Sequence, residues 1–133
     1  MFSCFARVTL ADEVSARSLY ERMGGAPVVA AVSEQLIDRT VADPHLKRSF
    51  NKVNLPRLKQ MLTEQLCALA GGPCTYSGDS MVVVHAGLNI KQDEFYGMVE
   101  VLRQVMVANG IGLRERNELL ALLAPMKRDV VTR

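Results

Sequence analysis

The sequence has no tryptophan, only 5% aromatic residues and only two histidines, His45 and His85, in 133 residues. Leucine, valine, alanine and methionine must therefore fill the interior, and this mixture favours helices. No apolar run is long enough to span a bilayer. Sixteen basic and fourteen acidic residues give a formal net charge of +2 without a long block of one sign. That near balance argues against a nucleic acid or an anionic membrane as a partner.

The length indicates one domain, because 133 residues can bury one sizeable core and are too few for two. The N-terminal segment lacks the unbroken apolar run and the small-residue cleavage pattern of a signal peptide. We therefore predict a flexible extension over residues 1–17 and a folded domain over residues 18–133. A cleavable organelle address stays open as an alternative for the extension.

The three cysteines give no metal-site signature. Cys4, Cys67 and Cys74 are an odd number without CxxC spacing, and none precedes His85 in the CxxCH form that attaches a haem covalently. Two of them lie on or just after an apolar helical pattern. We interpret them as buried or incidental thiols and expect a cytoplasmic protein.

Hydrophobic periodicity predicts helices throughout and no strands. Ser18 is expected to cap the first helix, and Asn89 with Gln92 to form the capping box of a later one. The expected helices cover 19–23, 27 to about 41, the segment from Asn54-Leu55-Pro56 to Gly71-Gly72, a segment from the Asn89 capping box to Gly110 and Gly112, and a last one from about Arg114 that Pro125 interrupts. A short turn is expected over 44–50.

The segment from Gly71 to Ser80 has no periodicity and is rich in glycine, proline and serine. A loop of this length in a small helical domain usually has a function. Three valines then lead to His85. A lone histidine after an apolar run is often a hydrogen-bonded core residue, but it also suits an iron that needs one neutral nitrogen. The residues alone leave both interpretations open.

An ordered set of motifs carries a family resemblance. Its members are Tyr20 before Gly24-Gly25, Ala42-Asp43-Pro44-His45-Leu46 with Phe50, Gly71-Gly72-Pro73, Tyr76, Gly78, Met81, His85 and Gly87-Leu88-Asn89-Ile90. From residue 18 to about 131 the chain resembles the group I truncated haemoglobins. The resemblance implies an all-α, two-over-two globin-like helical sandwich with a short proximal segment. It also implies a non-covalent haem b with His85 as the proximal iron ligand.

The resemblance also assigns the haem pocket. Phe50 matches the haem-stacking phenylalanine, and Arg57, in preference to Lys59, matches the cation near the propionates. A plain core aromatic and a solvated charge explain the same two residues. His45 is expected at the surface, and Met126 stands near where some relatives link a histidine to a haem vinyl group, so no such link is expected. The other expected pocket residues are Ile37, Leu58, Leu62, Leu66, Tyr76, Met81, Val84, Leu88, Ile90, Phe95 and Met98.

The distal side departs from the family pattern. Members that hold dioxygen tightly have a tyrosine on the second helix and a glutamine on the distal helix, whereas the corresponding positions here are Ile37, Leu58 and Leu62. None of these side chains can donate a hydrogen bond. We expect dioxygen retention to fall by about tenfold to a hundredfold, from a loss of about 1 to 3 kcal/mol. The same change disfavours nitric oxide dioxygenation, an activity that the resemblance also implies.

Met61 lies where six-coordinate relatives carry a histidine or lysine that binds the iron. A thioether is a soft iron ligand, and histidine with methionine is the ligand pair of electron-transfer cytochromes. Methionine is also a common filler of irregular cores, so both roles stay open.

Three functions remain from the sequence. The first is a haem protein that binds dioxygen, carbon monoxide or nitric oxide, and the second is a six-coordinate haem protein in electron transfer or redox and gas sensing. The third, a helical scaffold without haem, leaves the loop and His85 unexplained. The expected partners are diatomic gases and an unidentified reductase, without nucleic acid or membrane, and the chain is expected to be a monomer or weak dimer.

Overall fold

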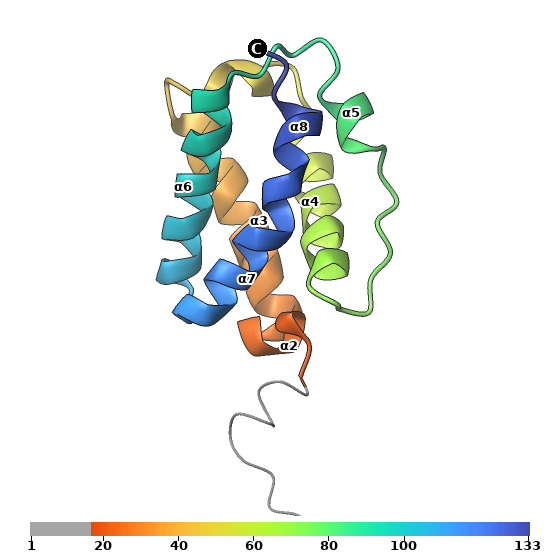
Figure 1. Ribbon diagram of the computed structural model, residues 1–133, viewed down its shortest axis with the longest axis vertical. Coiled ribbons are helices and arrows are strands. Elements are labelled where there is room, and N and C mark those ends of the chain that lie inside the picture. The colour runs from red at the N-terminus through yellow and green to blue at the C-terminus, as the bar shows by residue number, and fades with distance from the viewer. Residues whose placement is uncertain (1–16) are drawn as a thin grey trace, which may run out of the picture.

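A computed structural model of the chain describes residues 17–133 (Figure 1). The described residues contain helices and no strand, which confirms the expected all-α class. The elements are α2 (Leu19–Met23), α3 (Gly25–Ala42), the 3-10 helix η1 (Lys47–Phe50), α4 (Leu55–Leu69), α5 (Met81–Val84), α6 (Gln92–Ala108), α7 (Leu113–Leu123), the 3-10 helix η2 (Ala124–Met126) and α8 (Lys127–Val130). Cys4 and all of the expected extension except Arg17 lie outside the described residues.

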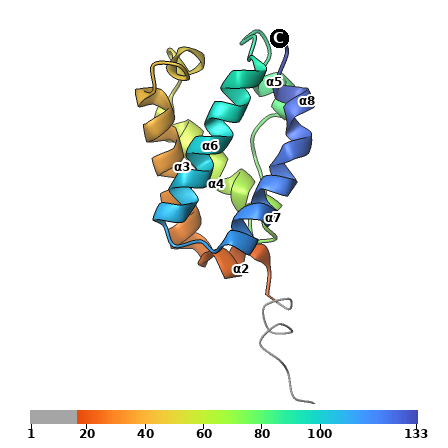
Figure 2. The same ribbon diagram turned by 60° about the vertical axis from the view of Figure 1, so that its left-hand side comes forward.

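The helices form two layers. Helix α3 packs against α4 and α6, while α2 closes one end by contacting α3 and α7. Helix α7 continues through η2 into α8, which brings the C-terminus to the other end of the molecule (Figures 1 and 2). Pro125 lies within η2, so the expected interruption of the last helix is confirmed. The core between the layers consists of Leu19, Met23, Val29, Val32, Leu36, Leu66, Cys67, Ala70, Leu102, Val105, Met106, Ile111 and Leu119.

The first helix begins and ends where the sequence predicts. The Ser18 hydroxyl accepts a hydrogen bond from the Glu21 backbone at 3.1 Å, which satisfies a donor that the first turn leaves free. Gly24 has a φ of +121°, and a Cβ there would lie 2.4 Å from a methyl group of Val28. Only glycine fits this close approach between α2 and α3.

The predicted capping box of Asn89 and Gln92 is wrong. Asn89 has a φ of +52°, and Ile90 pairs with Val131 in an isolated parallel bridge, so the chain is not helical before Gln92. The Glu94 carboxylate accepts a hydrogen bond from the Lys91 backbone at 3.0 Å and so caps α6 two residues later than expected.

A long, mostly irregular segment connects α4 to α6. We call residues 70–91 the proximal strap, and α5 is its short helix. The Ser80 hydroxyl accepts a hydrogen bond from the Val83 backbone at 3.3 Å and caps α5, which packs against α8. The loop predicted from Gly71 to Ser80 is confirmed, and the α-helical turn over Met81–Val84 is an addition to it.

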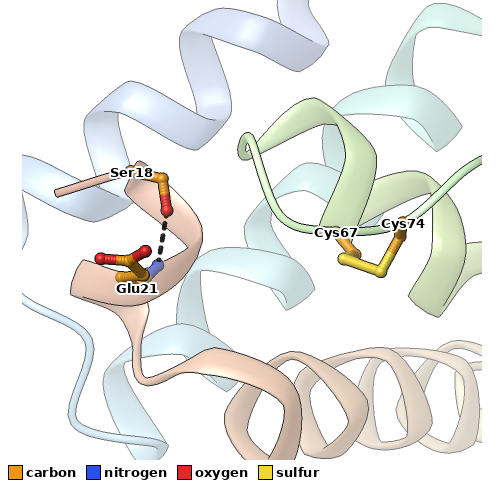
Figure 3. Close-up of a disulfide and its surroundings, with 4 residues drawn as sticks. All are labelled: Ser18, Glu21, Cys67 and Cys74. Atoms are coloured by element: carbon orange, nitrogen blue, oxygen red, sulfur yellow. Dashed lines mark hydrogen bonds between the residues drawn. A yellow bond between two sulfur atoms is a disulfide. The ribbon is translucent and has the colours of Figure 1, made fainter.

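The interpretation of Cys67 and Cys74 as unpaired thiols is wrong. They form a disulfide between the last turn of α4 and the beginning of the proximal strap (Figure 3). The chain reverses tightly at Gly72, where a Cβ would lie 2.6 Å from Cys67 Sγ and 2.8 Å from the Tyr20 ring. This turn brings the two Cα atoms to 5.8 Å, a separation that a spacing of seven residues does not reveal by itself.

Arg48 ties the far end of the strap to the body of the protein. Its guanidinium donates to the backbone oxygens of Leu88 and Asn89, each at 2.9 Å, and forms an ion pair with Glu94. The Glu94 side chain is only 7% exposed. Its pKa is lowered, mainly by the hydrogen bond from Arg48.

Replacing Glu94 by glutamine should lower the free energy of unfolding at pH 7 by about 1.5 kcal/mol, the lower end for a charged hydrogen bond, because Arg48 is half-exposed. The pKa of Glu94 lies below its ordinary 4.5 in the folded state, so this contribution is present above pH 4.5 and is lost as the pH falls further. Urea unfolding across pH 3 to 7 measures it.

Asp93→Asn is the matched control, because Asp93 contacts His45 at 3.1 Å in an exposed pair. It should change the stability by less than about 0.5 kcal/mol. Equal effects of the two substitutions at pH 7 would contradict the role given to Glu94.

Candidate cofactor site

The described residues line a partly open cavity of about 450 Å³ between α3, α4, the proximal strap and α6. This volume lies in the usual range of sites for small molecules and cofactors. The structure brings every predicted pocket residue to its wall. They are Ile37, Phe50, Arg57, Leu58, Met61, Leu62, Leu66, Tyr76, Met81, Val84, His85, Leu88, Ile90, Phe95 and Met98.

His85 is the C-cap of α5, so its position is set by that short helix. Its Nδ1 lies 2.8 Å from the backbone oxygen of Met81. A carbonyl can only accept, so Nδ1 carries the proton and the neutral ring keeps its lone pair on Nε2. Among the described residues, none forms a hydrogen bond with Nε2. Metal-binding histidines usually have this arrangement, in which one nitrogen is oriented by a carbonyl and the other is free.

Arg57 supplies a positive charge to the cavity wall. No ion pair of Arg57 exists among residues 17–133, so its charge is available to an anionic group. Lys59 instead contacts Asp38 at 2.7 Å and Glu34 at 3.9 Å on α3, and the hydrogen bond that it donates to Asp38 raises its pKa. The structure therefore favours Arg57 over Lys59 as the cation of this site. His45 is exposed, as the sequence predicts, and does not line the cavity.

The α3 and α4 walls are apolar beside the cavity. Ile37 and Leu66 are each 1% exposed, and Leu58 and Leu62 line the same cavity. Met61 also lines the cavity, and the Ser77 hydroxyl lies 3.8 Å from its sulfur. Such walls exclude water from the space between α3 and α4.

Sequence reasoning missed Gln65, a polar cavity residue one helical turn after Met61. Its amide nitrogen lies 3.2 Å from Met81 Sδ and 3.8 Å from Met126 Sδ. Thioether sulfur is a weak acceptor, so this amide has donors that are poorly satisfied within the cavity. Its spacing of four residues from Met61 is the signal that places it on the same helix face.

Other lining residues were also absent from the prediction. Thr40 and Glu94 are polar, but each already has a partner: the Thr40 hydroxyl donates to the Leu36 oxygen at 2.6 Å, and Glu94 pairs with Arg48. The further lining residues are Leu36, Leu46, Ser49, Val53, Asn54, Gly78, Asp79, Val99, Leu102, Leu123, Met126 and Val130.

The residues present fit a haem. A porphyrin needs apolar walls for its ring, a cation for its carboxylates and a protein nitrogen for its iron, and the cavity combines these in one place. The part of the chain that is described holds no group of three or more histidine, cysteine, aspartate or glutamate side chains that could bind a metal ion directly. A haem iron does not require such a group, because the porphyrin itself supplies four nitrogens.

Comparison with known proteins agrees with this fit. The profile of the bacterial-like globin family matches residues 18–132. The chain is 32% identical over 115 residues to the group 1 truncated hemoglobin GlbN of Mycolicibacterium paratuberculosis. The matched region covers 86% of this chain and 85% of that protein. It is 24% identical over 115 residues to the group 1 truncated hemoglobin of Tetrahymena pyriformis, covering 86% and 95% of the two chains.

Solved structures show the same fold. The truncated hemoglobin of Tetrahymena pyriformis in its Fe(III) form superposes with a TM-score of 0.84 at 24% identity, over 88% of this chain and 100% of that one. The 2/2 hemoglobin of a Synechococcus species, described in the cyanomet state with covalently attached heme, gives a TM-score of 0.81 at 23% identity over the same shares. The predicted resemblance to group I and the predicted two-over-two fold are confirmed.

Gln65→Leu should leave the ligand-free protein as stable as the unsubstituted one or stabilise it by about 1 kcal/mol, because it removes a poorly satisfied polar group from an apolar wall. Tyr76→Phe is the control. The Tyr76 hydroxyl donates to the Asp79 oxygen at 2.8 Å, so its loss should cost about 1 kcal/mol. Urea unfolding measures both, and a Gln65→Leu loss as large as that of Tyr76→Phe would show that the amide is structurally satisfied.

Proposed function

This chain belongs to the bacterial-like globin family and is a haem-binding globin, and we propose that it binds diatomic gases at a non-covalent haem b held by His85. The observation that supports His85 most strongly is its hydrogen bond to the Met81 oxygen. That bond fixes the tautomer with Nε2 unprotonated. A haem held here would supply an iron that His85 Nε2 could bind and that could take a small ligand.

Helices α3 and α4 provide an apolar wall of the cavity. The side chains of this wall determine which gases the iron would retain. Ile37, Leu58 and Leu62 exclude water and donate no hydrogen bond. The wall therefore favours a weakly polar ligand such as carbon monoxide over dioxygen, whose retention should be about tenfold to a hundredfold lower than with donors present. A tight dioxygen store or an efficient nitric oxide dioxygenase does not suit these residues.

Gln65 adds a hydrogen-bond donor to this cavity. Among residues 17–133, its amide is bonded only to the sulfurs of Met81 and Met126, so it can turn to a better acceptor at small cost. It provides a hydrogen-bond donor on α4 at a position other than those of the tyrosine and glutamine that the family uses. We propose that it contributes to ligand retention more than the three aliphatic residues do.

A second candidate function is electron transfer or redox sensing by an iron with two protein ligands. The observation that favours it is Met61, which lines the cavity from α4, with the Ser77 hydroxyl at 3.8 Å. An apolar pocket with a thioether favours ferrous iron, and any external gas must first displace the methionine. A reductase that keeps the iron ferrous is the implied partner in either function.

We propose a monomer or weak dimer in the cytoplasm. Stable disulfides are rare in that compartment, and those that form there are usually transient. No helix within residues 17–133 is long and apolar enough to cross a membrane.

Haem titration tests the main proposal. Added haem should give one Soret band that saturates at one haem per chain. His85→Gly should lose that band or weaken it, and added imidazole should restore it, because the free ligand then replaces the missing ring. His45→Gly is the control and should bind haem normally, since His45 is exposed outside the cavity. A His85→Gly spectrum identical to the original would contradict the assignment of His85.

Met61→Leu separates the two candidate functions. If Met61 binds iron, the ferrous spectrum without added gas should change from a six-coordinate to a five-coordinate form, and carbon monoxide should bind faster. Met98→Leu, a change to another cavity methionine on α6, should leave the spectrum unaltered. Unchanged ferrous and ferric spectra of Met61→Leu would overturn ligation by Met61 and leave the gas-binding globin in place.

A further inference from the structure

The disulfide joins two parts of the cavity wall. Cys67 follows Leu66, a buried wall residue of α4, and Cys74 lies two residues before Tyr76, a wall residue of the proximal strap. The strap leads from Cys74 to α5 and His85. The covalent link therefore connects α4 with the segment that carries His85 (Figures 1 and 3).

Among the described residues, few other hydrogen bonds hold residues 73–80 of the strap to the helices. The Ser77 hydroxyl donates to the Glu64 carboxylate at 2.9 Å, and this contact is exposed. The Tyr76 hydroxyl bonds to Asp79 within the strap itself and so does not attach it to the body. The second half is attached independently, by Arg48 and by the bridge between Ile90 and Val131. Opening the disulfide would thus loosen the strap on the Cys74 side and leave its other end in place.

The two sulfurs differ in access. Cys67 is 1% exposed and belongs to the hydrophobic core, whereas Cys74 lies exposed at the surface of the strap. A thiolate from solvent can therefore approach the Cys74 sulfur and not that of Cys67. Thiol exchange begins with such an attack on an accessible sulfur.

We propose that Cys67 and Cys74 form a reversible redox site that is reduced by a protein dithiol and that controls how firmly the strap holds His85 under the cofactor. One thiolate of the reductant attacks Cys74 Sγ, forms a mixed disulfide and releases the Cys67 thiolate, which takes a proton. The second thiolate of the reductant then attacks its own mixed-disulfide sulfur and releases Cys74 as a thiol. The chain gains two electrons and two protons, and the reductant becomes a disulfide.

The effect on haem depends on the proposed function, but the effect on the strap does not. With the link open, the strap samples more conformations, and His85 is held less firmly. The affinity for haem should then fall by about 5-fold to 150-fold, the usual range of coupling between two sites, and haem should leave faster. Since this coupling of equilibria is reciprocal, bound haem should lower the equilibrium constant for reduction of the disulfide by the same factor.

Three measurements on the full chain test this. All samples carry Cys4→Ser, which removes the third thiol. Three forms are compared: the oxidised protein, the protein reduced and then freed of reductant under argon, and the variant that also carries Cys67→Ser and Cys74→Ser. Alkylation and mass spectrometry follow the disulfide in dithiothreitol buffers of graded ratio. Transfer of ferric haem to an excess of a haem-free acceptor protein gives the rate of loss. Limited proteolysis reports cleavage within residues 70–91.

We expect haem transfer and cleavage of the strap to be faster in the reduced form than in the oxidised form. The variant with all three cysteines replaced should have the same rates as the reduced form. Bound haem should shift the midpoint of the dithiothreitol titration toward more reducing buffer. Ser77→Ala with the disulfide intact is the control, and its haem transfer should stay within about twofold of the oxidised form, less than the lower limit of the coupling range. Equal transfer and cleavage rates in the oxidised and reduced forms would overturn the proposal, as would failure of the two cysteines to pair in oxidising buffer. If no Soret band forms at all, the proposed function fails, and the cleavage rates of the haem-free chain still decide whether the disulfide controls the strap.

Discussion

The site depends on one hydrogen bond, from His85 Nδ1 to the backbone oxygen of Met81. The bond is made across a single turn of α5, whose cap is Ser80. A helix of four residues has little stability of its own, so its position must come from outside it. The packing of α5 against α8 supplies that support. The free Nε2 of His85 is consequently only as well placed as the strap that carries α5.

The strap is therefore the part of the fold on which function depends. It replaces a longer helix by a segment attached at separate points: a disulfide to α4 at its beginning, α8 beside α5, and Arg48 with the Ile90 bridge at its end. A segment attached at few points can be loosened at one without unfolding the domain. The wall residues Leu36 of α3 and Leu66 of α4 belong by contrast to the buried core. The structure thus combines a rigid wall on one side of the cavity with an adjustable one on the other.

The sequence predicts those features that local chemistry determines. Ser18 and Gly24 suffice to bound α2, and the spacing of leucines along α4 suffices for that helix and its apolar wall. The start of α6 could not be predicted, because the Ile90 bridge and the Arg48 ion pair with Glu94, both tertiary contacts, set it. The disulfide depends on a turn at Gly72 that no spacing reveals. Gln65 was missed because a polar residue in an apolar stripe reads as surface until the cavity is seen.

The pocket lining was predicted as a set because the family motif gives residue positions, not because composition does. Hydrophobic periodicity alone places Leu58, Leu62 and Leu66 on one face, but it cannot say that the face meets His85 across a cavity. The decisive measurement is the position of iron in a crystal structure of the haem-loaded protein, located by its anomalous scattering. We expect iron at His85 Nε2 with Nδ1 still donating to the Met81 oxygen. Iron bound to any other residue in place of His85, or iron bound to Nδ1 after it has left the Met81 oxygen, would contradict the role given to His85.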